Sequence, residues 1–172
     1  MTRYVALLRA VNVGGRVIKM DALRTAFDEL GFDEVSTFIA SGNVLFGGSG
    51  PRASLERTIE THLADRFGFE VATFLRTGAE LESTLRVDVP KRTAWNVAFA
   101  KAALTTAQSD AVQTLSNDID RFVVDAAEVH WSCTRAQRES KFSNVRLERT
   151  IGAPTTMRNI TTVRKLADLL IH

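Results

Sequence analysis

The chain has 172 residues, and 45% of them are hydrophobic, which is enough to build the core of one ordinary domain or of two small ones. Its apolar runs are far shorter than the ~20 residues that a membrane helix needs, so we expect neither a membrane span nor a membrane partner. The net charge of +2 hides an asymmetry, because residues 1–130 carry 14 Lys or Arg against 17 Asp or Glu, whereas residues 131–172 carry 8 against 3.

The positive excess near the C-terminus favours an anionic partner on that surface, although a solvated basic face explains it more simply. Cys133 is the only cysteine, so neither an internal disulfide nor a cluster of thiolate metal ligands can form. The sequence reaches its first strand without the pattern of a secretory signal. We therefore expect a cytoplasmic protein.

The first half of the chain predicts the order strand, helix, strand, strand, helix, strand. Residues 4–11 are apolar on both alternating faces except for Arg9, which is typical of a strand covered on both sides. A helical period then runs to Gly31, and a second helix begins near Pro51, which suits a first turn. The other strands are expected at residues 35–39, 44–46 and 71–76, with a hairpin turn at 40–43.

A connector helix and a second series of the same order follow. Thr77 and Glu80 have the spacing of a capping box, which starts the connector helix, and Thr105 and Gln108 offer a second box for a later helix. The strands of this half are expected at residues 95–100, 121–124, 129–133 and 155–158, with a helix within 140–151 and a final helix through Leu170.

These two series predict an α+β fold of two ferredoxin-like subdomains, each an alpha-beta plait of the order βαββαβ. We expect the subdomains at residues 1–76 and 94–158, joined by a connector helix and loop at 77–93 and followed by a C-terminal helix at 159–172. Because the first strand of each half is apolar on both faces, we also expect the two halves to pack together.

Three segments carry a resemblance to a known family. They are Leu-Leu-Arg-Ala-Val-Asn-Val-Gly-Gly at residues 7–15, Phe-Ile-Ala-Ser-Gly-Asn-Val at 38–44, and Ser-Lys-Phe-Ser-Asn at 140–144 with Thr-Met-Arg-Asn at 156–159. Together they resemble the bacterial domain of unknown function 1697 (DUF1697) over nearly the whole chain. The resemblance implies a two-plait architecture and supplies no substrate, because the family has no established activity.

The sequence departs from the usual pattern of this family at Ala10, where Gly is common, and at Ala40, where Asn is common. Ile160 stands where Trp is common. The last departure argues against an aromatic stacking role at that position.

Arg9 is the first candidate for binding an anion, because it is the single charge in an apolar strand. Backbone N–H groups of Gly14 and Gly15 and the following helix N-terminus favour the same ligand. An ion pair with a buried carboxylate explains Arg9 equally well. The Gly-Gly pair has the spacing of neither a dinucleotide fingerprint nor a P-loop.

The segments at 140–144 and 158–162 place cations beside hydroxyl and amide side chains, the combination that recognises phosphate or carboxylate. Helix capping accounts for several of these polar residues as well. We expect the candidate ligand-binding residues to converge on a small anion between the two halves; they are Arg9, Asn12, Gly14, Gly15, Lys141, Asn144, Arg158 and Asn159.

Other reactive residues favour structural roles. Ser41 belongs to the expected turn and lacks the surroundings of a catalytic serine, and the three histidines have no metal-ligand spacing, so no metal site is expected. His130 falls on the strand face opposite Trp131, where a surface position or a position between the subdomains is favoured. We expect four residues to be buried, namely Trp95, Phe99, Trp131 and Cys133.

Three classes of function remain open. The first is binding of an anionic ligand, which includes a nucleotide, a phosphorylated metabolite or a nucleic acid, although the strands do not match the aromatic patterns of RNA-recognition modules. The second is an enzyme that acts on a small phosphorylated or carboxylated metabolite, for which no general base and no cofactor is identifiable. The third is a protein-interaction module. Fold analogy does not choose among them, nor does it give the oligomeric state.

Overall fold

The computed structural model describes residues 1–9, 12–39, 42–90 and 93–172, and of residues 12 and 13 it describes the backbone. Two compact units make up this structure. The first consists of Met1–Glu82 and Lys165–His172, and the second consists of Ser83–Arg164.

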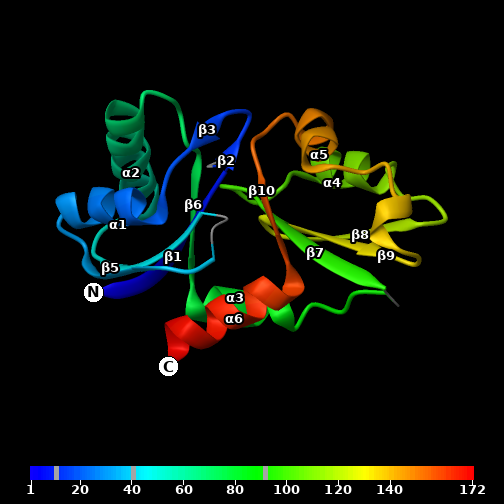
Figure 1. Cartoon of the computed structure of the whole chain (residues 1–172). Coiled ribbons are helices and arrows are strands. Elements are labelled where there is room, and N and C mark those ends of the chain that lie inside the picture. The colour runs from blue at the N-terminus through cyan, green and yellow to red at the C-terminus, as the bar shows by residue number, and fades with distance from the viewer. Residues whose placement is uncertain (10–11, 40–41, 91–92) are drawn as a thin grey trace. The chain divides into compact units, whose positions relative to one another are not determined.

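The first unit contains a four-stranded antiparallel sheet with the strand order β4-β5-β1-β6. Two helices, α1 and α2, lie on one face of this sheet (Figure 1). A small two-stranded sheet, β2-β3, follows β1. The elements are β1 Thr2–Leu8, β2 Asn12–Val13, β3 Arg16–Val17, α1 Met20–Glu29, β4 Asp33–Thr37, β5 Asn43–Gly48, α2 Arg52–Phe67, β6 Thr73–Thr77 and α3 Gly78–Leu85.

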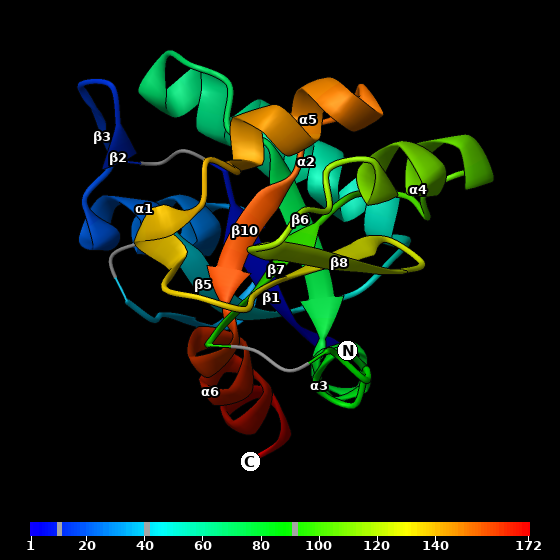
Figure 2. The same cartoon turned by 90° about the vertical axis from the view of Figure 1, so that its right-hand side faces the viewer.

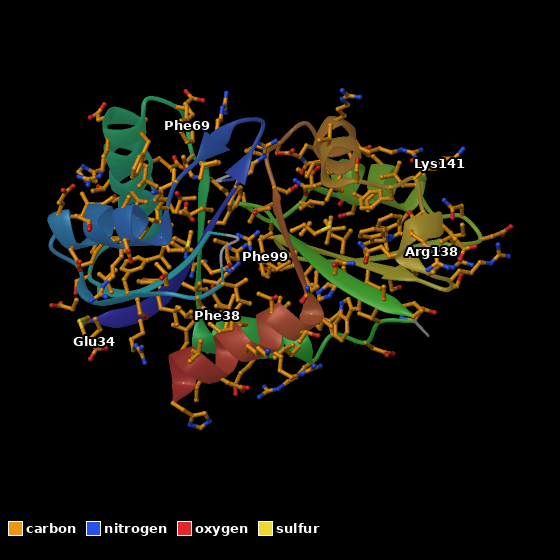
Figure 3. The ribbon with its side chains drawn as sticks, in the orientation of Figure 1. Glu34, Phe38, Phe69, Phe99, Arg138 and Lys141 are labelled. Atoms are coloured by element: carbon orange, nitrogen blue, oxygen red, sulfur yellow. The ribbon has the colours of Figure 1, made fainter. Side chains whose placement is uncertain are left out.

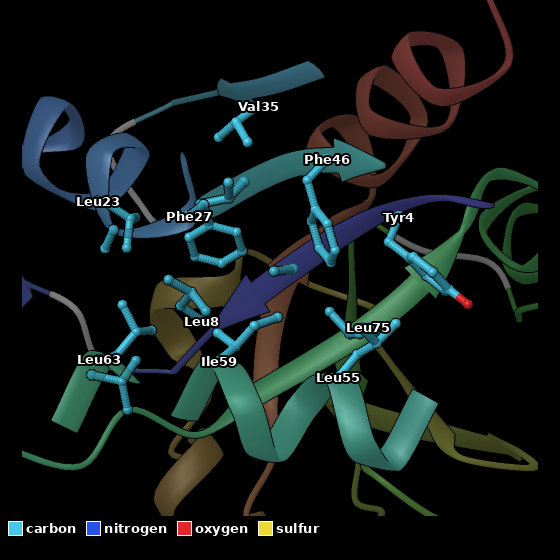
Figure 4. Close-up of a cluster of buried hydrophobic side chains, with 14 of the residues drawn as sticks. Tyr4, Leu8, Leu23, Phe27, Val35, Phe46, Leu55, Ile59, Leu63 and Leu75 are labelled. Atoms are coloured by element: carbon cyan, nitrogen blue, oxygen red, sulfur yellow. The ribbon is translucent and has the colours of Figure 1, made fainter. Parts of the chain in front are cut away.

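The core of the first unit lies between its sheet and its helices (Figure 4). Apolar residues at helical spacing on α2, such as Ile59 and Leu63, are fully buried and belong to this core. Phe46 of β5 is the aromatic centre, with its ring 5.4 Å from that of Phe27 and 4.5 Å from that of Phe32. Each large apolar side chain buried in this way stabilises the fold by about 1.5–3 kcal/mol.

Strand β1 is buried on both of its faces. Tyr4, Ala6 and Leu8 belong to the core beneath the helices, and Val5 and Leu7, which point to the opposite face, are also fully buried. The expectation of a doubly covered first strand is therefore confirmed. The regular strand ends at Leu8, earlier than expected, and Arg9 follows directly after it.

The second unit contains a four-stranded antiparallel sheet with the order β10-β7-β9-β8. Helices α4 and α5 lie side by side over one face of it (Figures 1 and 2). The elements are β7 Ala94–Phe99, α4 Thr106–Gln113, β8 Asp120–Asp125, β9 Glu128–Cys133, the short 3-10 helix η1 Gln137–Glu139, α5 Asn144–Ile151, β10 Thr156–Asn159 and α6 Ile160–Ile171, whose last part belongs to the first unit.

An aromatic group forms the core of the second unit. The ring of Phe142 lies 4.8 Å from those of Phe122 and Trp131, and Leu147 and Ile151 of α5 close the cluster. The expected burial of four residues is confirmed, since the exposed fractions are 6% for Trp95, 0% for Phe99, 4% for Trp131 and 0% for Cys133.

Both expected capping boxes are confirmed. The Thr77 hydroxyl accepts the backbone N–H of Glu80, and the Glu80 carboxylate accepts the backbone N–H of Thr77 at 2.8 Å, which begins α3. Thr105 and Gln108 make the same reciprocal pair before α4. Each box satisfies backbone donors that a helix start would otherwise leave bare.

The β2–β3 hairpin is a feature that the sequence pattern did not reveal, because strands this short show no alternation. Gly14 and Gly15 form its turn with φ values of 63° and 80°, the pair of positive angles that a two-residue hairpin turn requires. The expected pairing of β4 with β5 is confirmed, while residues 40 and 41 of their turn lie outside the described residues. Within the described parts of the chain, no helix has the length and apolar character to cross a membrane.

Candidate functional site

The expected ligand-binding residues divide between the two units. Arg9, Asn12, Gly14 and Gly15 belong to the first unit, whereas Lys141, Asn144, Arg158 and Asn159 belong to the second. Their convergence on one anion stays a prediction.

Arg158 is a buried cation on β10, directly opposite Val97 of β7. Its exposed fraction is 8%, and its Nη1 atom donates to the hydroxyl of Thr156 at 2.8 Å and to the carbonyl of Met157 at 2.9 Å. Removal from water disfavours the charged form and lowers the pKa of Arg158 to about 10. The guanidinium therefore still carries its charge at neutral pH.

Asn159 has a structural role that the sequence left open. Its side-chain oxygen accepts the backbone N–H of Thr162 at 2.8 Å, which caps the start of α6. The capping explanation of this residue therefore applies, and its side chain is otherwise exposed.

Asn144 joins α5 to the strand that follows it. Its amide nitrogen donates to the carbonyl of Thr155 at 3.0 Å, and its oxygen accepts the hydroxyl of Thr155 at 2.6 Å. Glu148, one turn along α5, accepts the backbone N–H of the same threonine at 3.0 Å. These bonds hold the loop before β10 against the helix, so Asn144 stabilises the fold whether or not it binds a ligand.

The serines beside Asn144 are also explained by the fold. Ser143 caps α5 by accepting the backbone N–H of Arg146 at 3.2 Å. Ser140 donates to Asp120 at 2.6 Å and accepts the backbone N–H of Phe142 at 3.0 Å.

Lys141, between these two serines, is exposed and is labelled in Figure 3 at the surface of the second unit. It is the residue of segment 140–144 whose side chain remains open to an anionic partner in solvent.

The buried carboxylate of Asp120 accepts hydrogen bonds from several side chains of the second unit. Its exposed fraction is 2%, and it accepts the indole N–H of Trp131 at 2.8 Å as well as the amide of Asn117 at 3.0 Å. Burial raises the pKa of the neighbouring Cys133 thiol, with the charge of Asp120 as the second cause. Cys133 is therefore a core residue rather than a nucleophile.

In the first unit, Arg9 is half-buried, and its backbone N–H donates to the carbonyl of Ala72 at 2.9 Å. Gly14 and Gly15 are exposed at the hairpin turn, where their positive φ values already account for glycine. Arg16 of the same hairpin lies with its guanidinium 5.3 Å from the ring centre of Phe69, which is labelled in Figure 3.

Arg76 is a buried cation that sequence reasoning missed. It lies on β6 opposite Val5, has an exposed fraction of 2%, and donates from Nη1 to the carbonyl of Leu75 at 2.8 Å. The sequence shows the same pattern at both buried arginines. Arg76 directly precedes the capping residue Thr77, and Arg158 directly precedes the capping residue Asn159.

His130 is fully buried on β9, so the surface position, the first of the two positions expected for it, is wrong, and the position between the subdomains stays a prediction. Strand parity separates the two faces of a strand but does not show which of them is covered. Trp95 donates its indole N–H to His130 Nδ1 at 3.0 Å. Burial lowers the pKa of His130 to about 4 against a weaker opposing effect of Asp125, so the ring is neutral and its proton is on Nε2.

The described residues form no metal centre, and a small pocket in the second unit contains no candidate residue. Nowhere in residues 1–9, 12–39, 42–90 and 93–172 do three or more His, Cys, Asp or Glu side chains gather closely enough to hold a metal ion. A small pocket of about 170 Å³ in the second unit is lined by residues 100–104, Gln108, Ile151, Ala153 and Pro154, none of them a candidate residue. The side chain of Gln108 in this pocket already has a hydrogen-bond partner, since its amide donates to the carbonyl of Ile151 at 2.8 Å.

The fold is shared with a solved bacterial structure. The chain is similar to the conserved bacterial protein SP0830 from Streptococcus pneumoniae, with 25% sequence identity and a TM-score of 0.81 over 100% of this chain and 99% of that one. The α+β class is thereby confirmed. Among curated proteins, no significant match exists. Residues 1–130 match the family described as "Protein of unknown function (DUF1697)", and the chain therefore belongs to this family.

Proposed function

We propose that this protein binds a small anionic ligand, a nucleotide, a phosphorylated metabolite or a phosphate group of a nucleic acid, and that Arg158 attracts it. The observation that carries the proposal is a guanidinium that keeps its charge while only 8% of the residue is exposed. The planar guanidinium also matches the two oxygens that a phosphate or carboxylate presents.

We further propose that each unit is a ferredoxin-like plait. The support is the order of the strands in each sheet. In the first unit β1 lies between β6 and β5, and in the second unit β7 lies between β10 and β9. In this arrangement the helices cover one face of the sheet and not the other. Arg158 lies on that other face, because its neighbour Met157 packs against the core beneath α4 and α5.

We also propose a cytoplasmic location. The support is the single cysteine of the chain, Cys133, which is a buried free thiol and has no second cysteine to form an internal disulfide.

Thermal unfolding in the presence of anions tests the proposed function. A ligand present at a hundredfold excess over its Kd should stabilise the folded protein by about 2.7 kcal/mol, which raises Tm. The panel is inorganic phosphate, mononucleotides, sugar phosphates and short oligonucleotides, each matched for ionic strength because surface charge effects depend on salt. The class that raises Tm most identifies the partner.

The variants Arg158→Met and Arg149→Met provide the matched comparison. Arg149 is an exposed arginine on α5 of the same unit, so its loss removes the same charge without touching the sheet face. We expect Arg158→Met to lose the ligand-induced rise in Tm and Arg149→Met to keep it. If no anion raises Tm, or if both variants respond like the original protein, the proposed function is wrong.

A further inference from the structure

The segment 135–146 of the second unit is strongly basic at its surface. Its one acidic residue is Glu139, which is exposed. The cations of the segment are also exposed, and we call them the basic surface; they are Arg135, Arg138, Lys141 and Arg146. Arg138 and Lys141 are labelled in Figure 3 at the outer side of the second unit.

The fold does not neutralise the charges of the basic surface. Within the described parts of the chain, none of its four cations forms a salt bridge with a carboxylate, whereas in the first unit Arg52 pairs with Glu80 and Arg66 with Glu29. Like charges grouped along a short segment repel one another in the free protein. An anionic partner that spans the basic surface therefore relieves this repulsion.

Arg146 stands at the end of α5 where a cation is unfavourable. It lies in the first turn of this helix, a turn without an acidic residue, and the N-terminal end of a helix carries a partial positive charge. Arg149 lies in the last turn, where a cation stabilises the helix. Helix stability thus explains Arg149, which we leave out of the basic surface, and it does not explain Arg146.

The spacing of the cations suits a partner with many regularly placed charges. Arg135, Arg138 and Lys141 follow one another at intervals of three residues, so the Cα atoms of neighbouring cations are at most about 11 Å apart. A nucleic-acid duplex carries one negative charge per about 1.7 Å of its axis. Several phosphates of one duplex therefore come within reach of these long side chains.

The rest of the second unit favours a duplex over a single strand. Proteins hold single strands by stacking the bases on exposed aromatic rings. All five aromatic residues of the second unit are buried, namely Trp95, Phe99, Phe122, Trp131 and Phe142. A duplex keeps its bases stacked on one another and presents its phosphates outward, so it needs no such ring.

An anionic membrane fits the basic surface less well. A helix that binds a membrane surface presents a broad apolar face beside its cations. Val145 is the one large hydrophobic residue exposed in the described part of the second unit.

We propose that the basic surface binds the phosphate backbone of a nucleic-acid duplex without reading its sequence. Arginine and lysine supply the charge for such contacts, and phosphate contacts carry no sequence information by themselves. This inference goes beyond the proposed function, because Arg158 lies on the sheet face that α5 does not cover, whereas Arg146 is exposed on α5.

Fluorescence anisotropy with a labelled DNA duplex and a labelled RNA duplex, each of about 20 base pairs, tests the inference. Four phosphate contacts give a slope of about −3.6 for the logarithm of the binding constant against the logarithm of salt concentration, so Kd should rise about 150-fold between about 50 and 200 mM salt. Failure of both duplexes to bind at the lower salt concentration would overturn the inference.

The double variant Arg138→Gln with Lys141→Gln removes half of the basic surface. Its Kd should rise only about 12-fold over the same range of salt, because two contacts remain. The matched control is Arg24→Gln with Arg57→Gln, which removes the same net charge from exposed positions on α1 and α2. The control should keep the original salt dependence, and if it loses as much as the double variant, net charge and not the basic surface binds the duplex.

The remaining outcomes decide the partner and separate the two proposals. Tighter binding of the single strand of the same sequence, or of vesicles that contain phosphatidylserine, overturns the choice of a duplex. If Arg158→Met removes duplex binding while the double variant keeps it, the duplex binds at Arg158 and the basic surface is wrong, although the proposed function stands. If the basic surface binds the duplex while no small anion raises Tm, the proposed function is wrong and this inference stands.

Discussion

The neutral, buried state of His130 predicts that the protein loses stability as the solution becomes mildly acidic. Burial lowers the pKa of His130 from its ordinary 6.5 to about 4, so between these values the unfolded chain takes up a proton that the folded protein rejects. The stabilising contribution is therefore complete above pH 6.5 and is lost as pH falls through 4.

The size of this loss follows from the two pKa values. The difference between 6.5 and about 4 corresponds to about 3 kcal/mol once both forms of the protein are protonated. About 2 kcal/mol of it is already lost between pH 7.5 and pH 5. Hydrogen bonds and nearby cations lower the pKa values of Glu29 and Glu80. The stability that these two carboxylates contribute is therefore lost at a lower pH than this interval.

Urea unfolding followed by tryptophan fluorescence at half-unit steps from pH 7.5 to pH 5 measures the effect. His130→Gln has no titrating ring and should show a nearly flat free energy of unfolding across this interval. His62→Gln removes a half-buried histidine paired with Glu29, and it should keep the steep dependence of the original protein. If the original protein and His130→Gln depend on pH equally, His130 is not buried in its neutral form and the reasoning is wrong.

Three further predictions test the structural roles assigned above by urea unfolding at pH 7.5. Asp120→Ala should lower the free energy of unfolding by about 2–4 kcal/mol because it leaves the buried indole N–H of Trp131 without its acceptor, and an effect under 0.5 kcal/mol would contradict that role. Asn159→Ala should cost about 1 kcal/mol through the lost cap of α6, with Asn159→Asp close to the original stability. Gly15→Val should cost about 1–2 kcal/mol because its φ of 80° strains a residue with a side chain, whereas equal stability would show that the turn adapts.

Local signals explain why most of the fold was predictable. The capping pair of Thr77 and Glu80 and that of Thr105 and Gln108 act within one turn of the chain, so their spacing alone locates two helix starts. Strand periods and glycine stops act over similarly short distances. The β2–β3 hairpin was not predicted because strands of two residues show no alternation of apolar and polar residues.

The candidate site was harder to predict because burial and pairing are properties of the folded sheet. The parity of β9 placed His130 opposite Trp131, but parity does not say whether the opposite face is wet. Asn144 and Asn159 carried the right chemistry for a ligand, yet their bonds to Thr155 and Thr162 are set by a neighbouring strand and by a helix start. Sequence reasoning named helix capping beside ligand binding for Asn159, whereas for Asn144 it named ligand binding alone.

The internal repeat of the chain shows which of these features the fold requires. In the first unit the row equivalent to Arg158, Val97 and His130 consists of Arg76, Val5 and Leu45. The arginine is therefore common to both units, and in both it donates to the carbonyl of the preceding residue and precedes a helix cap.

The polar atoms beside the arginine are not common to both units. Leu45 occupies the position of His130, and Gly47, two residues later, occupies the position of Ser132. A leucine and a glycine occupy these positions in the first unit, so a four-stranded sheet of this strand order does not need a histidine and a serine there. Both units therefore carry a strand-end arginine, whereas His130 and Ser132 are particular to the second unit.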